Sequence, residues 1–158
     1  MTLSTEAIAI VTGGASWTAR QLTRGLASWD WAIVVVYLEH QREAETTVAE
    51  ILAAEGRTVA VRADLTDELD VERLFAESVA AFGGVDVVAH TTTESGAQLY
   101  RQAAEHLRRG GVIVSVSGTE ATTPVLGRRL RERGITVGTA QPGAMLAFLD
   151  RWRHGRSG

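Results

Sequence analysis

The 158-residue sequence contains no cysteine and no lysine. Without cysteine, the chain has neither a disulfide framework nor thiolate chemistry. All 16 basic residues are arginines, so any mechanism that needs a lysine amine or ammonium is excluded. Apolar runs are short as well. The longest, WAIVVVYL at 31–38, is far shorter than the roughly 20 residues that a helix needs to cross a bilayer.

The first 14 residues, MTLSTEAIAIVTGG, lack the basic region and the long apolar core of a signal peptide. We therefore expect a soluble cytoplasmic protein that does not bind membranes. The length predicts a single domain over residues 1–158, with a loose C-terminal tail from about residue 151. A domain of this size buries roughly 70% of the surface of its unfolded chain, so its core needs no covalent support.

Charge is unevenly distributed along the chain, although the net charge is only −3. Residues 1–100 hold 6 arginines and 15 acidic residues, whereas residues 101–158 hold 10 arginines and 4 acidic residues. Arginines 128, 129, 131 and 133 form a short basic cluster that fits either a nucleic-acid patch or a solvated helix face. We favour the solvated face, and nucleic acid is not an expected partner.

Short apolar, β-branched runs alternate with segments of helical periodicity. The runs lie at 7–11, 32–38, 58–63, 85–90, 111–117 and 135–140. Apolar stripes with a helical period occur at 44–52, 71–82 and 99–107. Gly56, Gly83, Gly110 and Gly134 stand after helical segments, where a residue in the left-handed conformation is expected. Six βα units of this kind predict a doubly wound parallel sheet of the Rossmann type, in three α/β/α layers. Ligands of such sheets bind at the carboxyl ends of the strands, near the switch point between the first and fourth.

Five segments follow one another at the predicted strand ends and turns: TGGASWTA at 12–19, ADLTD at 63–67, VDVVAHTT at 85–92, GGVIVSVSG at 110–118 and RERGITVGTAQPG at 131–143. In this order they resemble motifs of the short-chain dehydrogenase/reductase family. In the family these positions carry a TGxxxGxG turn, an adenine-binding aspartate, a strand ending in NNAG, the catalytic serine and a Pro-Gly pair. The resemblance implies an oxidoreductase that uses NAD or NADP.

The glycine turn is altered relative to the family. Gly13 keeps the first glycine, Trp17 replaces the second and Ala19 replaces the third. The second glycine normally lets the backbone approach the pyrophosphate of the cofactor closely, and the indole of Trp17 in its place would crowd that pyrophosphate. Ser16 could cap the following helix, whose N-terminus remains an anion site. Either this is a modified dinucleotide site, or it is a relic turn filled by Trp17.

Other cofactor contacts follow from the resemblance. Glu39 could accept hydrogen bonds from a ribose diol and would repel a 2′-phosphate, which favours NAD over NADP, although the neighbouring His40 leaves NADP open. Asp64 would bind the adenine amino group, with backbone contacts from Leu65; alternatively, Asp64 or Thr66 caps the next helix. Pro142-Gly143 matches the family's Pro-Gly segment. Binding could be weak or lost because of Trp17.

The family's catalytic YxxxK pair is missing. The only tyrosines are Tyr37 and Tyr100, and no lysine exists to accompany them. His90 and Ser117 are the remaining candidates for catalysis, although His90 is more often a structural histidine in such a place. No histidine, cysteine or carboxylate grouping has the spacing of a metal site.

Besides a nucleic-acid binder that uses the basic cluster, which is the least favoured, two hypotheses remain open for function. One is an atypical nucleotide-dependent oxidoreductase in which His90, Ser117 or a substrate group replaces the tyrosine. The other is a non-catalytic protein that binds a small ligand or an assembly partner. A homodimer through the segments 95–109 and 122–133 is also expected, because apolar stripes on them and Trp29, Trp31 and Trp152 add apolar area.

Overall fold

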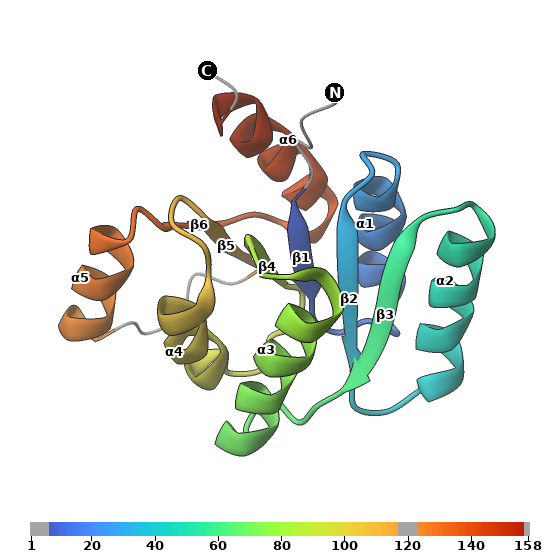
Figure 1. The fold of residues 1–158 in the computed structure, drawn as a ribbon, viewed down its shortest axis with the longest axis horizontal. Helices are drawn as coiled ribbons and strands as arrows, with labels where there is room; N and C mark the ends of the chain where they lie inside the picture. Colours follow the sequence, from blue (N-terminus) through green and yellow to red (C-terminus); the bar gives the residue numbers. More distant parts are fainter. Residues whose placement is uncertain (1–6, 117–122, 157–158) are drawn as a thin grey trace.

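A six-stranded parallel sheet forms the centre of the molecule in the computed structural model, which describes residues 7–116 and 123–156. The strands are β1 (Ile8–Val11), β2 (Ala32–Tyr37), β3 (Arg57–Arg62), β4 (Val87–His90), β5 (Val112–Ser115) and β6 (Thr136–Thr139). Their order is β3-β2-β1-β4-β5-β6 (Figure 1), so the order reverses between β1 and β4. The predicted doubly wound sheet is confirmed, and every predicted strand end agrees within two residues.

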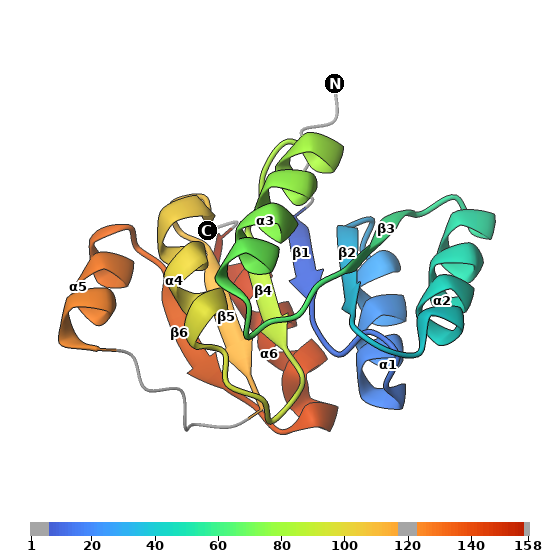
Figure 2. The same ribbon diagram turned by 90° about the horizontal axis from the view of Figure 1, so that it is seen from below.

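Helices cover both faces of the sheet and make the expected three layers (Figures 1 and 2). The helices are α1 (Trp17–Ala27), α2 (Gln41–Ala53), α3 (Glu68–Phe82), α4 (Ala97–His106), α5 (Pro124–Glu132) and α6 (Met145–Arg156), with a 3₁₀ turn η1 (Pro142–Ala144). Helices α1, α2 and α6 pack on one face, and α3, α4 and α5 pack on the other. No helix among the described residues has both the length and the apolarity needed to cross a membrane.

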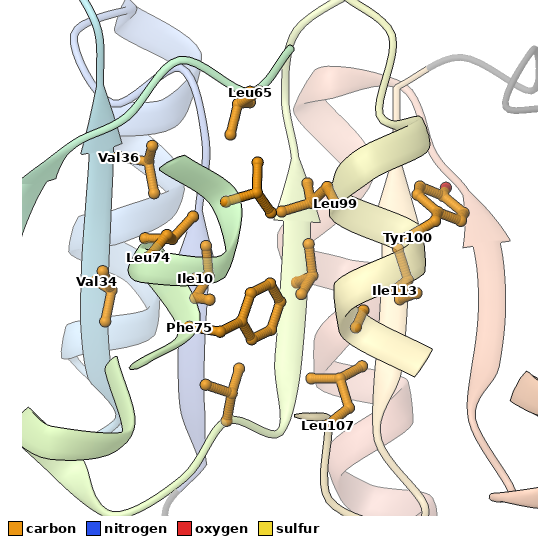
Figure 3. Packing of buried hydrophobic residues seen from close by; sticks show 14 of the residues in the cluster. Ile10, Val34, Val36, Leu65, Leu74, Phe75, Leu99, Tyr100, Leu107 and Ile113 are labelled. Atoms are coloured by element: carbon orange, nitrogen blue, oxygen red, sulfur yellow. The ribbon is translucent and has the colours of Figure 1, made fainter. Parts of the chain in front are cut away.

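Alternate residues of β1, β2, β4 and β5 enter different cores, as the two-residue period of a strand requires. On one face, Ile10, Val34 and Ile113 meet Phe75 of α3 and Leu107 of α4 (Figure 3). The strand residues between them, such as Val11, Val35 and Val114, lie in the core on the opposite face. Because helices cover both faces of the central strands, β1, β4 and β5 are buried throughout and β2 is buried up to its last residue, whereas the edge strands β3 and β6 are partly or largely exposed.

Most of the apolar groups that suggested a dimer are used within the chain, although Val125 of α5 is 73% exposed. Leu99, Tyr100, Ala103 and Leu107 of α4 are all buried in the core of one chain. Trp31 is also buried and makes edge-to-face ring contacts with Trp29 at 5.3 Å and with Trp152 at 5.9 Å. These contacts account for much of the apolar area without a second copy.

The expectation of a loose tail from about residue 151 is wrong for residues 151–156, which belong to α6. Trp152 packs against Trp31, and the guanidinium of Arg156 lies 4.6 Å from the ring centre of Trp152. A second arginine, Arg153, lies 4.0 Å from the ring of Trp29. Aromatic burial and two cation–π contacts therefore hold the last turns of α6 on the domain.

Helix ends follow local chemistry in most places. Gly83, Gly110 and Gly134 have positive φ angles, as predicted from their positions after helices. The prediction for Gly56 is wrong, because the left-handed residue there is Glu55, with φ of 65°. Gly56 instead allows a close approach: a Cβ atom on it would lie 2.5 Å from Cγ2 of Ile51.

Candidate functional site

A cleft of about 680 Å³ opens at the carboxyl ends of β1 to β4. Its described lining comes from the β1–α1 turn, the end of β2 with the start of α2, the loop after β3 and the loop after β4. In that order the residues are Gly13, Gly14, Ala15 and Ser16; Val36, Tyr37, Leu38, Glu39, His40 and Glu43; Ala63 and Leu65; and Thr92 and Glu94. This is the predicted edge of the sheet, and the cleft adjoins the switch point between β1 and β4.

The β1–α1 turn lies tightly against its neighbours. Gly13 has a φ of +64°, and a Cβ atom on it would lie 2.6 Å from Cγ2 of Thr92. Gly14 donates a backbone hydrogen bond of 2.7 Å to the carbonyl of Val36, and a Cβ there would lie 2.9 Å from that same oxygen. Only glycine fits these two positions without a shift of the turn. Sequence reasoning missed Gly14, although the doubled glycine after Thr12 was a signal for it.

Helix α1 begins at this turn, so its N-terminus lies at the cleft. Ser16 has an extended backbone conformation, and its hydroxyl accepts a hydrogen bond of 3.1 Å from the amide of Ala19. The predicted N-cap is therefore confirmed. A helix N-terminus carries partial positive charge and favours an anion. Ala19, in place of the third glycine, is fully buried, so its methyl group fits between helix and sheet.

Trp17 does not fill the turn. It is the first residue of α1, its side chain is 73% exposed, and it is not among the residues that line the cleft. The alternative of a relic turn filled by this indole does not describe the structure. The N-terminal residue of a helix can point outward while its amide faces the ligand side, and the sequence alone does not distinguish these directions.

His90 joins the ends of β1 and β4 by hydrogen bonds. Its ring is fully buried; Nε2 lies 2.8 Å from the carbonyl oxygen of Glu94, and Nδ1 lies 2.9 Å from Oγ1 of Thr12. A carbonyl oxygen only accepts, so Nε2 carries the proton and Nδ1 accepts from the hydroxyl of Thr12. That hydroxyl oxygen also accepts from the amide of Thr91 at 3.1 Å. Both ring nitrogens are therefore occupied within the protein.

The rim of the cleft is acidic. Glu39, Glu43 and Glu94 line it, and none of the described lining residues is an arginine. His40 adopts a left-handed conformation with φ of 60° before α2, and its Nδ1 lies 3.8 Å from a carboxylate oxygen of Glu43. The rim therefore favours hydroxyl and amino groups over a further phosphate.

Asp64 is held by Thr66 in a local turn after β3. Its Oδ1 accepts hydrogen bonds of 2.6 Å from the hydroxyl and 2.9 Å from the amide of Thr66, and these bonds lower the pKa of the Asp64 carboxyl. The expectation that Asp64 or Thr66 caps α3 is wrong, because Asp67 is the cap and accepts from the amides of Leu69 and Asp70. Leu65 is buried and lines the cleft, whereas Asp64 stands beside it.

Other predicted site residues lie elsewhere or outside the description. Pro142 and Gly143 form η1 beyond β6; both are exposed, and neither lines the cleft. Ser117 lies outside the described residues. The structure thus brings together Gly13, Ser16, Glu39 and Leu65, and it adds residues that the sequence did not single out.

The strand order and the glycine turn at the switch point define a Rossmann-like α/β protein. The sequence model of short chain dehydrogenases matches residues 7–106, which run from the residue before β1 to the end of α4. The chain belongs to the short-chain dehydrogenase/reductase family, and thus to a family of oxidoreductases.

Relatives and solved structures agree with this assignment. A hydroxynaphthalene reductase-like protein Arp2 of Metarhizium robertsii is 29% identical over 143 residues, which cover 74% of this chain and 52% of the relative. The chain thus spans about half the length of that relative. An uncharacterized oxidoreductase of Methylorubrum extorquens is 28% identical over 178 residues, covering 86% of this chain and 72% of its own.

A putative dehydrogenase from Burkholderia cenocepacia with bound NADP has a similar fold, with a TM-score of 0.73 at 22% identity over 86% of this chain and 68% of that one. A short-chain dehydrogenase from Oenococcus oeni has a TM-score of 0.74 at 14% identity, covering 96% of this chain and 91% of that one. At these identities the likeness concerns the fold.

Proposed function

We propose that this chain binds NAD in the cleft at the ends of β1 to β4 and lacks the family's usual means of proton transfer. One observation carries the proposal: the tight Gly13–Gly14 turn leads into the N-terminus of α1 at the switch point of the sheet. Glycine backbone lets a diphosphate approach closely, and the N–H groups at a helix N-terminus favour its negative charge. The residues present therefore fit the adenosine diphosphate half of the cofactor.

Each wall of the cleft has a distinct role in this proposal. The turn and the α1 N-terminus hold the diphosphate, and Glu39 accepts hydrogen bonds from the ribose diol. Ala63 and Leu65 provide apolar contact for the adenine. The carboxylate of Asp64, which Thr66 holds in the turn beside Leu65, accepts a hydrogen bond from the adenine amino group. A bound nicotinamide cofactor would supply or accept hydride.

The residues available for proton transfer do not suit the usual reaction. There is no lysine, Tyr100 is buried in the core, and Tyr37 stands at the end of β2 in the adenosine part of the cleft. We assign His90 a structural role, because both of its ring nitrogens are engaged. These observations favour the second hypothesis, a nucleotide-binding protein without catalysis, over an atypical reductase.

We expect negligible turnover of ketones, aldehydes and alcohols with NAD(H). General acid–base assistance at the reacting oxygen contributes about 10²–10⁴-fold, and the chain lacks the family's tyrosine–lysine pair. The rate at which NADH absorbance falls, at a high protein concentration and with a panel of carbonyl substrates, measures the turnover. Robust reduction that is insensitive to substitution of both His90 and Ser117 would contradict our account of the missing pair.

Replacement of Trp17 with alanine should leave NAD affinity within about twofold, because an exposed side chain outside the cleft contributes little to binding. Replacement of Gly13 with alanine is the matched comparison. It should weaken binding, since its Cβ would meet Thr92 and a positive φ strains alanine. Calorimetric titration with NAD compares the two variants. A clear gain of affinity on removal of the indole would show that it does crowd the cofactor.

A further inference from the structure

Thr92 carries an unsatisfied hydroxyl in the wall of the cleft. Among the described residues, its Oγ1 is the one buried side-chain polar atom without a hydrogen-bond partner. Two neighbouring hydroxyls are engaged: that of Thr91 donates to the carbonyl of Thr12 at 2.8 Å, and that of Thr12 is bonded to His90. Thr92 therefore stands apart from the network that joins β1 to β4.

A buried hydroxyl without a partner is costly, so native proteins keep few of them. This one lies at the phosphate-binding turn. The methyl group of Thr92 approaches so closely that a Cβ on Gly13 would lie 2.6 Å from it. Hydroxyl and methyl branch from the same carbon, so rotation about χ1 by one staggered step brings the hydroxyl to the place of the methyl group, which moves to the place of the hydrogen. The hydroxyl can thereby reach the space above Gly13.

We infer that the Thr92 hydroxyl donates a hydrogen bond to an oxygen of the bound dinucleotide, on the diphosphate or the adjoining ribose. This inference rests on the proposed NAD binding and names a contact within that site. Phosphate oxygens only accept hydrogen bonds, and a hydroxyl supplies a donor. No arginine is among the described lining residues, so a neutral donor supplements the amides of the turn and of α1. Ligand binding then satisfies a group that the free protein leaves unpaired.

The test compares Thr92→Val, which keeps the shape and removes the hydroxyl, with Thr92→Ser, which keeps the hydroxyl. Titration calorimetry with ADP-ribose and with NAD gives the affinities, and thermal unfolding without ligand gives the stability. We expect Thr92→Val to bind both ligands about tenfold more weakly, the effect of one hydrogen bond at the upper end of its usual range. Thr92→Ser should stay within about twofold. Thr93→Val is the matched control, because Thr93 is exposed and outside the cleft lining.

The ligand-free stability distinguishes this role from a structural one. Since the hydroxyl has no partner, Thr92→Val should unfold at the same or a higher temperature than the wild type. A lower unfolding temperature would overturn the inference, because it would mean that the hydroxyl is bonded in the free protein. Unchanged affinity of Thr92→Val would overturn it too and would leave NAD binding intact. Failure of the wild type to bind either ligand at millimolar concentration would instead refute the proposed function, and the Thr92 contact with it.

Discussion

Replacement of His90 with alanine is expected to lower the free energy of unfolding by about 2–5 kcal/mol, from the loss of a buried side chain and of its hydrogen bonds. The ring is fully buried and bonded at both nitrogens. Without it, the carbonyl of Glu94 loses this donor, the hydroxyl of Thr12 loses this acceptor while it still accepts from the amide of Thr91, and a cavity remains between β4 and the loop that follows. Because domains are stable by only about 5–15 kcal/mol, the change is large. Urea unfolding of the variant and the wild type measures it.

His154→Ala is the matched control for this experiment. His154 is exposed near the end of α6, with its Nδ1 2.8 Å from the carbonyl of Asp150. Its removal should change stability by no more than about 0.5 kcal/mol, as is usual for surface positions. If His90→Ala proved as stable as His154→Ala, the ring would not join the two strands, and a catalytic role for His90 would regain support.

NADP is expected to bind roughly 10–100-fold more weakly than NAD, an energy of about 1.4–2.7 kcal/mol. The 2′-phosphate of NADP would lie beside the carboxylates of Glu39 and Glu43, with no arginine among the described lining residues to offset its charge. Two unit charges 4 Å apart interact by about 4 kcal/mol near a protein surface, before screening by salt. Calorimetric titration with both cofactors at two ionic strengths measures the difference, which should shrink as salt rises.

Glu39→Gln should narrow the gap between the two cofactors by several-fold, because it removes one repelling charge and keeps a hydrogen-bonding side chain. Glu72→Gln is the matched control, since Glu72 is exposed on α3 and away from the cleft. If the ratio of NAD affinity to NADP affinity were the same in Glu39→Gln and Glu72→Gln, the adenosine ribose would bind away from Glu39.

The family and the fold could be read from the sequence, because both depend on patterns that are local. Continuous β-branched runs mark strands buried on both faces, and the helical segments between them require parallel crossovers. Ser16 caps a helix through a hydrogen bond to a residue three positions later, and Gly13 allows the positive φ angle that the turn needs. Both effects act within one turn of the chain, so the places of these residues in the site were predictable. The position of Glu39 after a strand was enough to place it at the cleft.

The sequence by itself determined the order of strands and helices along the chain, the places of Gly13 and Ser16 in the β1–α1 turn, and the absence of the tyrosine–lysine pair. Tertiary structure decided which side chains meet. Thr12 and His90 are 78 residues apart in the chain, and only the pairing of β1 with β4 brings them within hydrogen-bonding distance. Packing between distant segments also decided three other features: the outward direction of Trp17, the isolated hydroxyl of Thr92 and the docking of Trp152. Composition and periodicity specify which residues face a core, whereas a partner from a distant segment depends on packing that no local pattern encodes.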